Sequence, residues 1–141
     1  MEEAMGWAKR SVTGQPFAQS GFDAYKNLAN GYEKTNRQAQ ADSVMNEGLT
    51  IANINQYISY GRTLITQKRR DRALDIILAA KAKFGDVYAA NNGLSYAYSA
   101  KADYVKALEY ANKALKQAPA PYLKNSINAN IEKLKEGKDI N

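Results

Sequence analysis

The chain has 141 residues, a formal net charge of +6, and neither cysteine nor histidine. The absence of thiols excludes disulfides and thiolate metal sites, and the absence of imidazoles removes the commonest general base and metal ligand. No apolar run approaches the roughly 20 residues that a membrane-spanning helix requires. Two glutamates follow Met1 directly, so we do not expect a signal peptide at this start.

Apolar residues recur at helical spacing along almost the whole chain, and short turns interrupt them. The expected helices, in chain order, cover about residues 1–12, 22–34, 37–51, 54–67, 70–84, 88–101, 104–117 and 122–136. Asp86 and Asp103 stand where an N-cap or first helical turn is expected, and Gly85 stands where a C-cap is expected. The pattern predicts an all-α fold.

Residues of the same kind recur at two fixed distances. Ala107 stands 34 residues after Ala73, which stands 32 residues after Ala41. The same two steps connect five further sets: Ala114, Ala80 and Gly48; Ser95, Gly61 and Ala29; Leu94, Tyr60 and Leu28; Tyr98, Leu64 and Tyr32; and Pro119, Gly85 and Asn53. The repeating unit is therefore expected to be a pair of antiparallel helices of roughly 34 residues, with small residues where the helices approach closely.

The two ends of the chain fit this register differently. Residues 1–19 match the second helix of a pair whose first helix is missing, so the chain is expected to start in mid-repeat. Residues 122–136 place Leu123, Ile127, Ile131 and Leu134 on one stripe. An apolar stripe with a polar opposite face is typical of a helix that caps a solenoid, and residues 137–141 follow it as a tail.

The pattern of a large residue, a small residue, then Tyr, Ala, Ala and Pro resembles the tetratricopeptide repeat (TPR). In residues 88–121 it is carried by Leu94, Ser95, Tyr98, Ala107, Ala114 and Pro119, with parallel sets in 54–87 and 22–53. The resemblance implies a right-handed superhelix of antiparallel helix pairs, a TPR-like α-solenoid. It would hold about three repeats and a C-terminal capping helix in a single domain spanning residues 1–141.

A narrower resemblance concerns the C-terminal repeats of a bacterial family of unknown function. The segments that carry it are YGRTLITQKRRDRALDIILAAKAKF, GLSYAYSAKADYVKALEYANKALKQAP and IEKLKEGKDIN. In that family a small β-rich domain precedes the repeats, and many members are exported. The resemblance implies that this chain is the C-terminal portion of a longer protein. If that longer protein is exported, the expected location is periplasmic or secreted. If it is not exported, the expected location is cytoplasmic.

Carboxylate pairs with helical spacing occur at Asp71 and Asp75 and at Glu132 and Glu136. Without histidine, a serine nucleophile has no obvious base, and the isolated glycines form no phosphate loop. We therefore interpret the carboxylates as solvated groups that stabilise their helices. No catalytic site, cofactor or metal site is expected.

A basic run occupies the predicted turn at residues 68–72. It is either a solvated turn or a contact for phosphate or an acidic protein surface. Because no aromatic residue flanks it to stack on bases, nucleic-acid binding is not expected.

In tetratricopeptide arrays the first helix of each pair lines a concave groove that holds a peptide or protein segment. The resemblance therefore implies a non-catalytic protein–protein interaction module. The residues placed on its groove are Lys26, Asn30, Glu33, Asn55, Arg62, Asn92, Tyr96 and Ser99. Lys26 and Asn30 also match the first pair of a carboxylate clamp for peptide C-termini, but Ser59, Ala89 and Gly93 replace its other members, so we expect no such clamp.

Two other roles remain open from the sequence. The repeats can act as a structural spacer that supports a missing N-terminal domain. Alternatively, the first segment can form a homodimer through apolar residues that lack a partner helix, namely Met5, Trp7, Ala8 and Val12.

Overall fold

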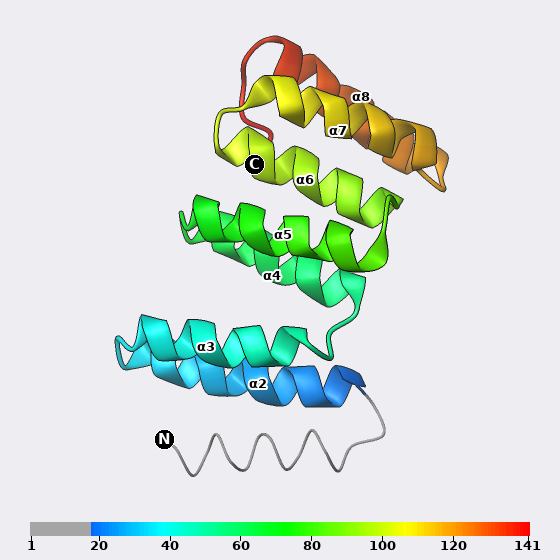
Figure 1. Ribbon diagram of the computed structural model, residues 1–141. Coiled ribbons are helices and arrows are strands. Elements are labelled where there is room, and N and C mark those ends of the chain that lie inside the picture. Colours follow the sequence, from blue (N-terminus) through cyan, green and yellow to red (C-terminus); the bar gives the residue numbers. More distant parts are fainter. Residues whose placement is uncertain (1–17) are drawn as a thin grey trace. The chain divides into compact units, whose positions relative to one another are not determined.

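The computed structural model describes residues 18–141, and this part of the chain consists of α-helices joined by turns, without strands (Figure 1). The helices are α2 (Ala18–Lys34), α3 (Gln38–Leu49), α4 (Ile54–Thr66), α5 (Arg70–Phe84), α6 (Tyr88–Ala100), α7 (Tyr104–Gln117) and α8 (Pro121–Lys135). The prediction of an all-α fold is confirmed, and each predicted helix from residue 22 onward corresponds to one of these elements. The predicted helix at residues 1–12 lies outside the described residues.

The chain divides into two compact units, Met1–Asn53 and Ile54–Asn141. The division falls where the sequence places the boundary between its first two complete repeats. In the described part of the first unit, α2 and α3 form a helical hairpin. A Cβ atom added to Gly48 of α3 would lie only 2.8 Å from the Cβ of Tyr25 on α2. The hairpin therefore requires a residue without a side chain at the predicted small position.

The second unit contains α4 to α8. Helix α4 contacts both α5 and α6, α6 also contacts α5 and α7, and α7 contacts α8. A Cβ added to Gly61 of α4 would lie 2.5 Å from Cγ1 of Ile77 on α5, and one added to Gly93 of α6 would lie 2.8 Å from Cδ1 of Ile58 on α4. Gly61 and Gly93 thus let neighbouring helices approach closely. The spacing of the sequence predicts a small residue at Gly61, whereas Gly93 is not one of the predicted positions.

The predicted apolar stripe of the last helix packs against α7. Ile127, Ile131 and Leu134 are buried in one cluster with the alanines of α7, and Leu123 packs against that cluster while remaining partly exposed. Alanines at helical spacing leave a flat surface that the larger side chains of α8 can cover. Burial of this apolar area contributes about 25 cal/mol per Å² to the stability of the second unit.

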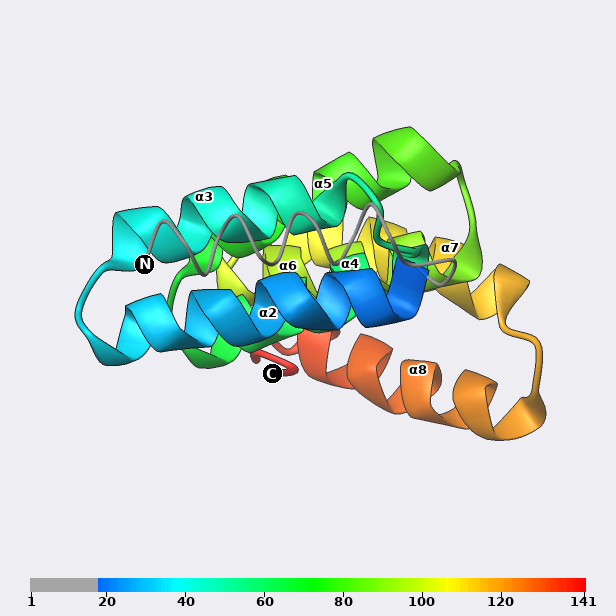
Figure 2. The ribbon, with the colours of Figure 1, turned by 90° about the horizontal axis from the view of Figure 1, so that it is seen from below.

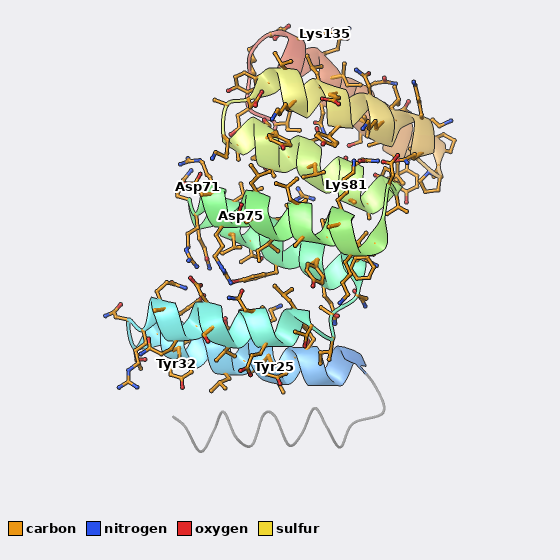
Figure 3. All side chains as sticks on the ribbon, in the orientation of Figure 1. Tyr25, Tyr32, Asp71, Asp75, Lys81 and Lys135 are labelled. Carbon is orange, nitrogen blue, oxygen red and sulfur yellow. The ribbon has the colours of Figure 1, made fainter. Side chains whose placement is uncertain are left out.

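A buried amide connects three helices of the second unit. Asn91 of α6 is 0% exposed and donates from Nδ2 to Asp86 Oδ1 and to Gln117 Oε1, both at 2.7 Å. Its Oδ1 accepts from Lys81 Nζ at 3.1 Å, and Lys81 lies on α5 (Figure 3). The hydrogen bond from Asn91 lowers the pKa of Asp86, although partial burial acts in the opposite direction. Every polar group of the Asn91 side chain thus has a partner, as burial requires.

The helix ends confirm two of the three predicted caps. Gly85 ends α5 with φ of 94°, a conformation that glycine adopts without strain. Asp103 caps α7, and its Oδ1 accepts from the backbone N–H of Lys106 at 3.2 Å. The prediction that Asp86 caps α6 is wrong, because Val87 is the N-cap of α6. Asp86 instead accepts a hydrogen bond from the side chain of Asn91.

Candidate functional site

The predicted groove residues divide between the two units. Lys26, Asn30 and Glu33 belong to the first unit, where they share one face of α2. Lys26 and Asn30 are exposed, and Glu33 is half-buried. This face of α2 is polar and mostly exposed.

The other predicted residues belong to α4 and α6 of the second unit. Asn55 and Arg62 are exposed on α4, and Asn92 and Tyr96 are half-buried on α6. Ser99 differs from the prediction, because its side chain is 1% exposed and is not presented to solvent. The residues of α4 and α6 can be considered together because these two helices are in contact.

One contact joins the predicted residues of α4 to those of α6. The guanidinium carbon of Arg62 lies 4.1 Å from the centre of the Tyr96 ring. The hydroxyl of Tyr96 in turn accepts from Nδ2 of Asn130 on α8, at 3.0 Å. Tyr96 therefore contacts Arg62 through its ring and Asn130 through its hydroxyl. The ring provides a surface that positions the guanidinium.

The last residues of the chain cover Ser99. After α8 the chain turns back, and its end lies beside α6 (Figures 1 and 2). Ser99 Oγ donates to Asp139 Oδ1 at 2.7 Å and accepts from the backbone N–H of Ile140 at 3.0 Å. Asn141 Nδ2 donates to the backbone oxygen of Tyr96 at 2.9 Å. The segment that the sequence indicates only as a tail thus binds the helix that was expected to face a partner.

A pocket of about 580 Å³ lies between α4, the turn after it, the end of α6 and the C-terminal residues. Its basic lining residues are Arg62, Lys68 and Arg70, and its acidic lining residue is Asp139. Hydroxyl-bearing residues of α4 complete much of the wall, namely Ser59, Thr63 and Thr66. We call this the basic pocket. Its volume lies within the range of about 300–1,000 Å³ that is usual for binding sites.

The charges of the basic pocket are not balanced. Among residues 18–141, no carboxylate lies within ion-pair distance of Arg62, Lys68 or Arg70. Burial tends to raise the pKa of Asp139, but hydrogen bonds from Asn141 and Ser99, together with the charge of Arg70, lower it below its usual value. Asp139 is therefore ionised at neutral pH, and one acidic side chain faces three basic side chains.

Two of these cations were not among the predicted groove residues. Lys68 stands in the turn with φ of 65°, and Arg70 is the first residue of α5. The sequence identifies their basic run but does not connect it to Arg62, which lies on the preceding helix. Other basic residues near the pocket are engaged elsewhere: Arg72 donates to the Tyr60 hydroxyl at 2.9 Å, and Lys101 pairs with Asp71.

The predicted carboxylate pairs form no common site. Asp71 binds Lys101, Glu132 lies 3.7 Å from Lys135, and Glu136 lies 2.9 Å from Lys138. Within residues 18–141, no group of three or more acidic side chains is arranged to hold a metal ion. Asp71, Glu132 and Glu136 are thus paired with basic side chains.

Comparison of the chain with protein-family models, curated proteins and solved structures finds no match in any of the three. Over the described residues, no helix has both the length and the apolar character needed to cross a membrane.

Proposed function

We propose that the second unit is a non-catalytic interaction module that binds an extended segment of a partner protein along α4 and α6. The observation that carries this proposal is the contact between Arg62 and Tyr96, which joins two predicted groove residues beside a pocket. In the tetratricopeptide arrangement, α4 and α6 are the first helices of consecutive repeats, and such helices line the groove. Their direct contact supports that arrangement.

The hydroxyls of α4 suit the backbone of an extended segment. Thr63 Oγ1 donates to the Ser59 carbonyl at 3.1 Å, and Thr66 Oγ1 donates to the Arg62 carbonyl at 3.2 Å. Because each hydroxyl proton is already used within the helix, the oxygen faces a ligand as an acceptor. Both threonines are exposed and line the basic pocket, so they can accept from backbone N–H groups of a bound segment.

Selection from a random-peptide display library on the full chain tests this function. We expect enriched peptides whose binding is lost in Arg62→Glu and retained in Lys124→Glu. Lys124 is an exposed residue of α8 outside the basic pocket, so its substitution is a control with the same change in net charge. Circular dichroism of both variants should show unchanged helix content. Failure to enrich any peptide, or equal binding by the two variants, would contradict the proposal.

The first unit is tested separately through Lys26. Lys26→Glu changes an exposed residue of α2 without altering the basic pocket. If the predicted groove includes these residues of α2, Lys26→Glu in the otherwise unsubstituted chain weakens the binding of a selected peptide, and the domain remains folded. An unchanged affinity on adding Lys26→Glu would restrict the binding face to the second unit.

A further inference from the structure

We propose that the basic pocket binds paired acidic side chains, and that the partner segment is therefore rich in Asp or Glu. This inference rests on the proposed function, because it names the chemistry of the segment that α4 and α6 bind. It is carried by Arg62, Lys68 and Arg70, which line one pocket and make no ion pair with the described residues.

The charge balance defines the ligand. Asp139 is the acidic residue that lines the basic pocket, and its Oδ1 already accepts hydrogen bonds from Ser99 and Asn141. With the tail in place, the three basic side chains that line the pocket outnumber its one acidic side chain by two. Two carboxylates of a bound segment would neutralise this excess without displacing the tail, which forms part of the pocket wall.

The basic side chains are presented in a suitable geometry. The guanidinium carbon of Arg62 lies over the Tyr96 ring, 4.1 Å from its centre, so the ring positions the cation. A planar guanidinium held in this way can donate two parallel hydrogen bonds to one carboxylate. Lys68 lies in a closed turn, where its backbone N–H donates to the Ile65 carbonyl at 2.9 Å. Less conformational freedom is lost on binding when the backbone of a ligand-binding residue is already fixed.

The pocket is less suited to a nucleic acid than to an acidic peptide. Nucleic-acid sites combine basic groups with aromatic rings on which bases stack. The basic pocket has no aromatic lining residue within the described part of the chain. Tyr96, the aromatic residue placed on the predicted groove, already has its ring against Arg62. Acceptor hydroxyls along α4 instead match the N–H groups of a peptide backbone.

The test uses four probes with the full chain: a hexaglutamate peptide, a hexaglutamine peptide, inorganic phosphate and a single-stranded DNA oligonucleotide. Binding of the labelled hexaglutamate is followed by fluorescence anisotropy, and the other three are added as competitors. We expect hexaglutamate to bind and to weaken as salt is added, since salt screens exposed charges. Hexaglutamine should not compete.

Variants connect this binding to the basic pocket. Arg62→Gln, Lys68→Gln and Arg70→Gln should each weaken hexaglutamate binding about two- to fivefold, as expected for exposed ion pairs. The triple variant should lose about tenfold or more, and Lys124→Gln should bind as the unsubstituted chain does. Equal losses in Lys124→Gln would show attraction to net charge alone and would overturn the site.

The remaining outcomes separate this inference from the proposed function. If display peptides bind through Arg62 but lack acidic residues, and hexaglutamate does not compete with them, the acidic specificity is wrong and the peptide-binding function stands. If the oligonucleotide or phosphate competes more strongly than unlabelled hexaglutamate, with the same sensitivity to the three substitutions, the ligand is a phosphate-bearing one and the inference is overturned. If no display peptide binds, the proposed function itself fails.

Discussion

Arg62 and Tyr96 lie in different helices, and the guanidinium carbon of one is 4.1 Å from the ring centre of the other. Arg62 is exposed on α4, whereas Tyr96 is half-buried on α6 and hydrogen-bonded to Asn130 of α8. The ring is therefore fixed before any partner arrives, and it sets the position of the cation. This relationship connects the packing of three helices to the basic pocket.

Substitution of Tyr96 tests whether the ring positions Arg62. Tyr96→Phe removes the hydroxyl that accepts from Asn130 but keeps the ring, so hexaglutamate binding should remain within about twofold. Tyr96→Ala removes the ring and should weaken binding about two- to fivefold, the value of an exposed cation–π contact. Fluorescence anisotropy measures both affinities, and circular dichroism checks that α6 remains folded. Similar losses in both variants would mean that the hydroxyl, rather than the ring, is what matters.

Two serines of α6 provide a matched pair for the contact with the tail. Ser99 makes two hydrogen bonds to residues 139 and 140, whereas the buried hydroxyl of Ser95 has no hydrogen-bond partner. Ser99→Ala should lower the free energy of unfolding by about 1 kcal/mol, while Ser95→Ala should change it by less than about 0.5 kcal/mol. Urea denaturation followed by circular dichroism compares the two. A greater loss for Ser95→Ala would contradict the hydrogen-bond assignment.

Close approach of α4 and α5 is tested at Gly61. An added methyl group would meet Cγ1 of Ile77 at 2.5 Å, within the middle of a fully buried side chain, so Gly61→Ala should destabilise the chain by about 1–3 kcal/mol. Gly93→Ala should cost less, because it meets the more movable end of Ile58. Gly31, in the interior of α2, has no atom within 4 Å of an added methyl group, and Gly31→Ala should stabilise by about 0.4–1 kcal/mol.

Thermal and urea denaturation of the three glycine variants gives their order. Because Gly61 is packed against Ile77 and Gly31 has open space, we expect Gly61→Ala to be the least stable variant and Gly31→Ala the most stable. A Gly61→Ala variant as stable as the unsubstituted chain would show that α4 and α5 separate easily.

These variants also mark what the sequence could predict. The helices, the alanine stripe of α7 and the close approach at Gly61 follow from local spacing, because side-chain position along a helix has a fixed period. The burial of Ser99 does not follow from local spacing. It depends on Asp139 and Ile140, which lie about 40 positions further along the chain and turn back after α8. The sequence identifies Lys68 and Arg70 as basic but does not predict that they share a pocket with Arg62, because a turn conformation decides where they lie.

Asn91 and Asn92 also show what the sequence could not predict, namely which of two adjacent residues of α6 is buried. Adjacent residues of a helix point about 100° apart, so a small difference in register decides which one is buried. Asn92 is half-buried and was placed on the groove, whereas Asn91 is fully buried among side chains of three segments. Only the packing of α5 and α7 against α6 distinguishes them.

The charge of Asp139 should oppose the binding of acidic ligands. Because its pKa is lowered, the carboxylate is fully ionised at neutral pH, and Asp139→Asn removes one negative charge from the basic pocket. The amide oxygen of asparagine can still accept from Ser99, so the tail should stay in place. Hexaglutamate affinity should increase about two- to fivefold, as measured by anisotropy. A decrease would indicate that Asp139 itself binds the ligand.

The most direct test of the central claim is amide chemical-shift mapping of the full chain with a display-selected peptide. We expect the largest changes along α4 and α6, at Arg62, Thr66 and Tyr96, and at the turn that holds Lys68 and Arg70. Arg62→Glu should abolish these changes while Lys124→Glu preserves them. Changes confined to α7 and α8, or unaffected by Arg62→Glu, would contradict the assignment of the binding face.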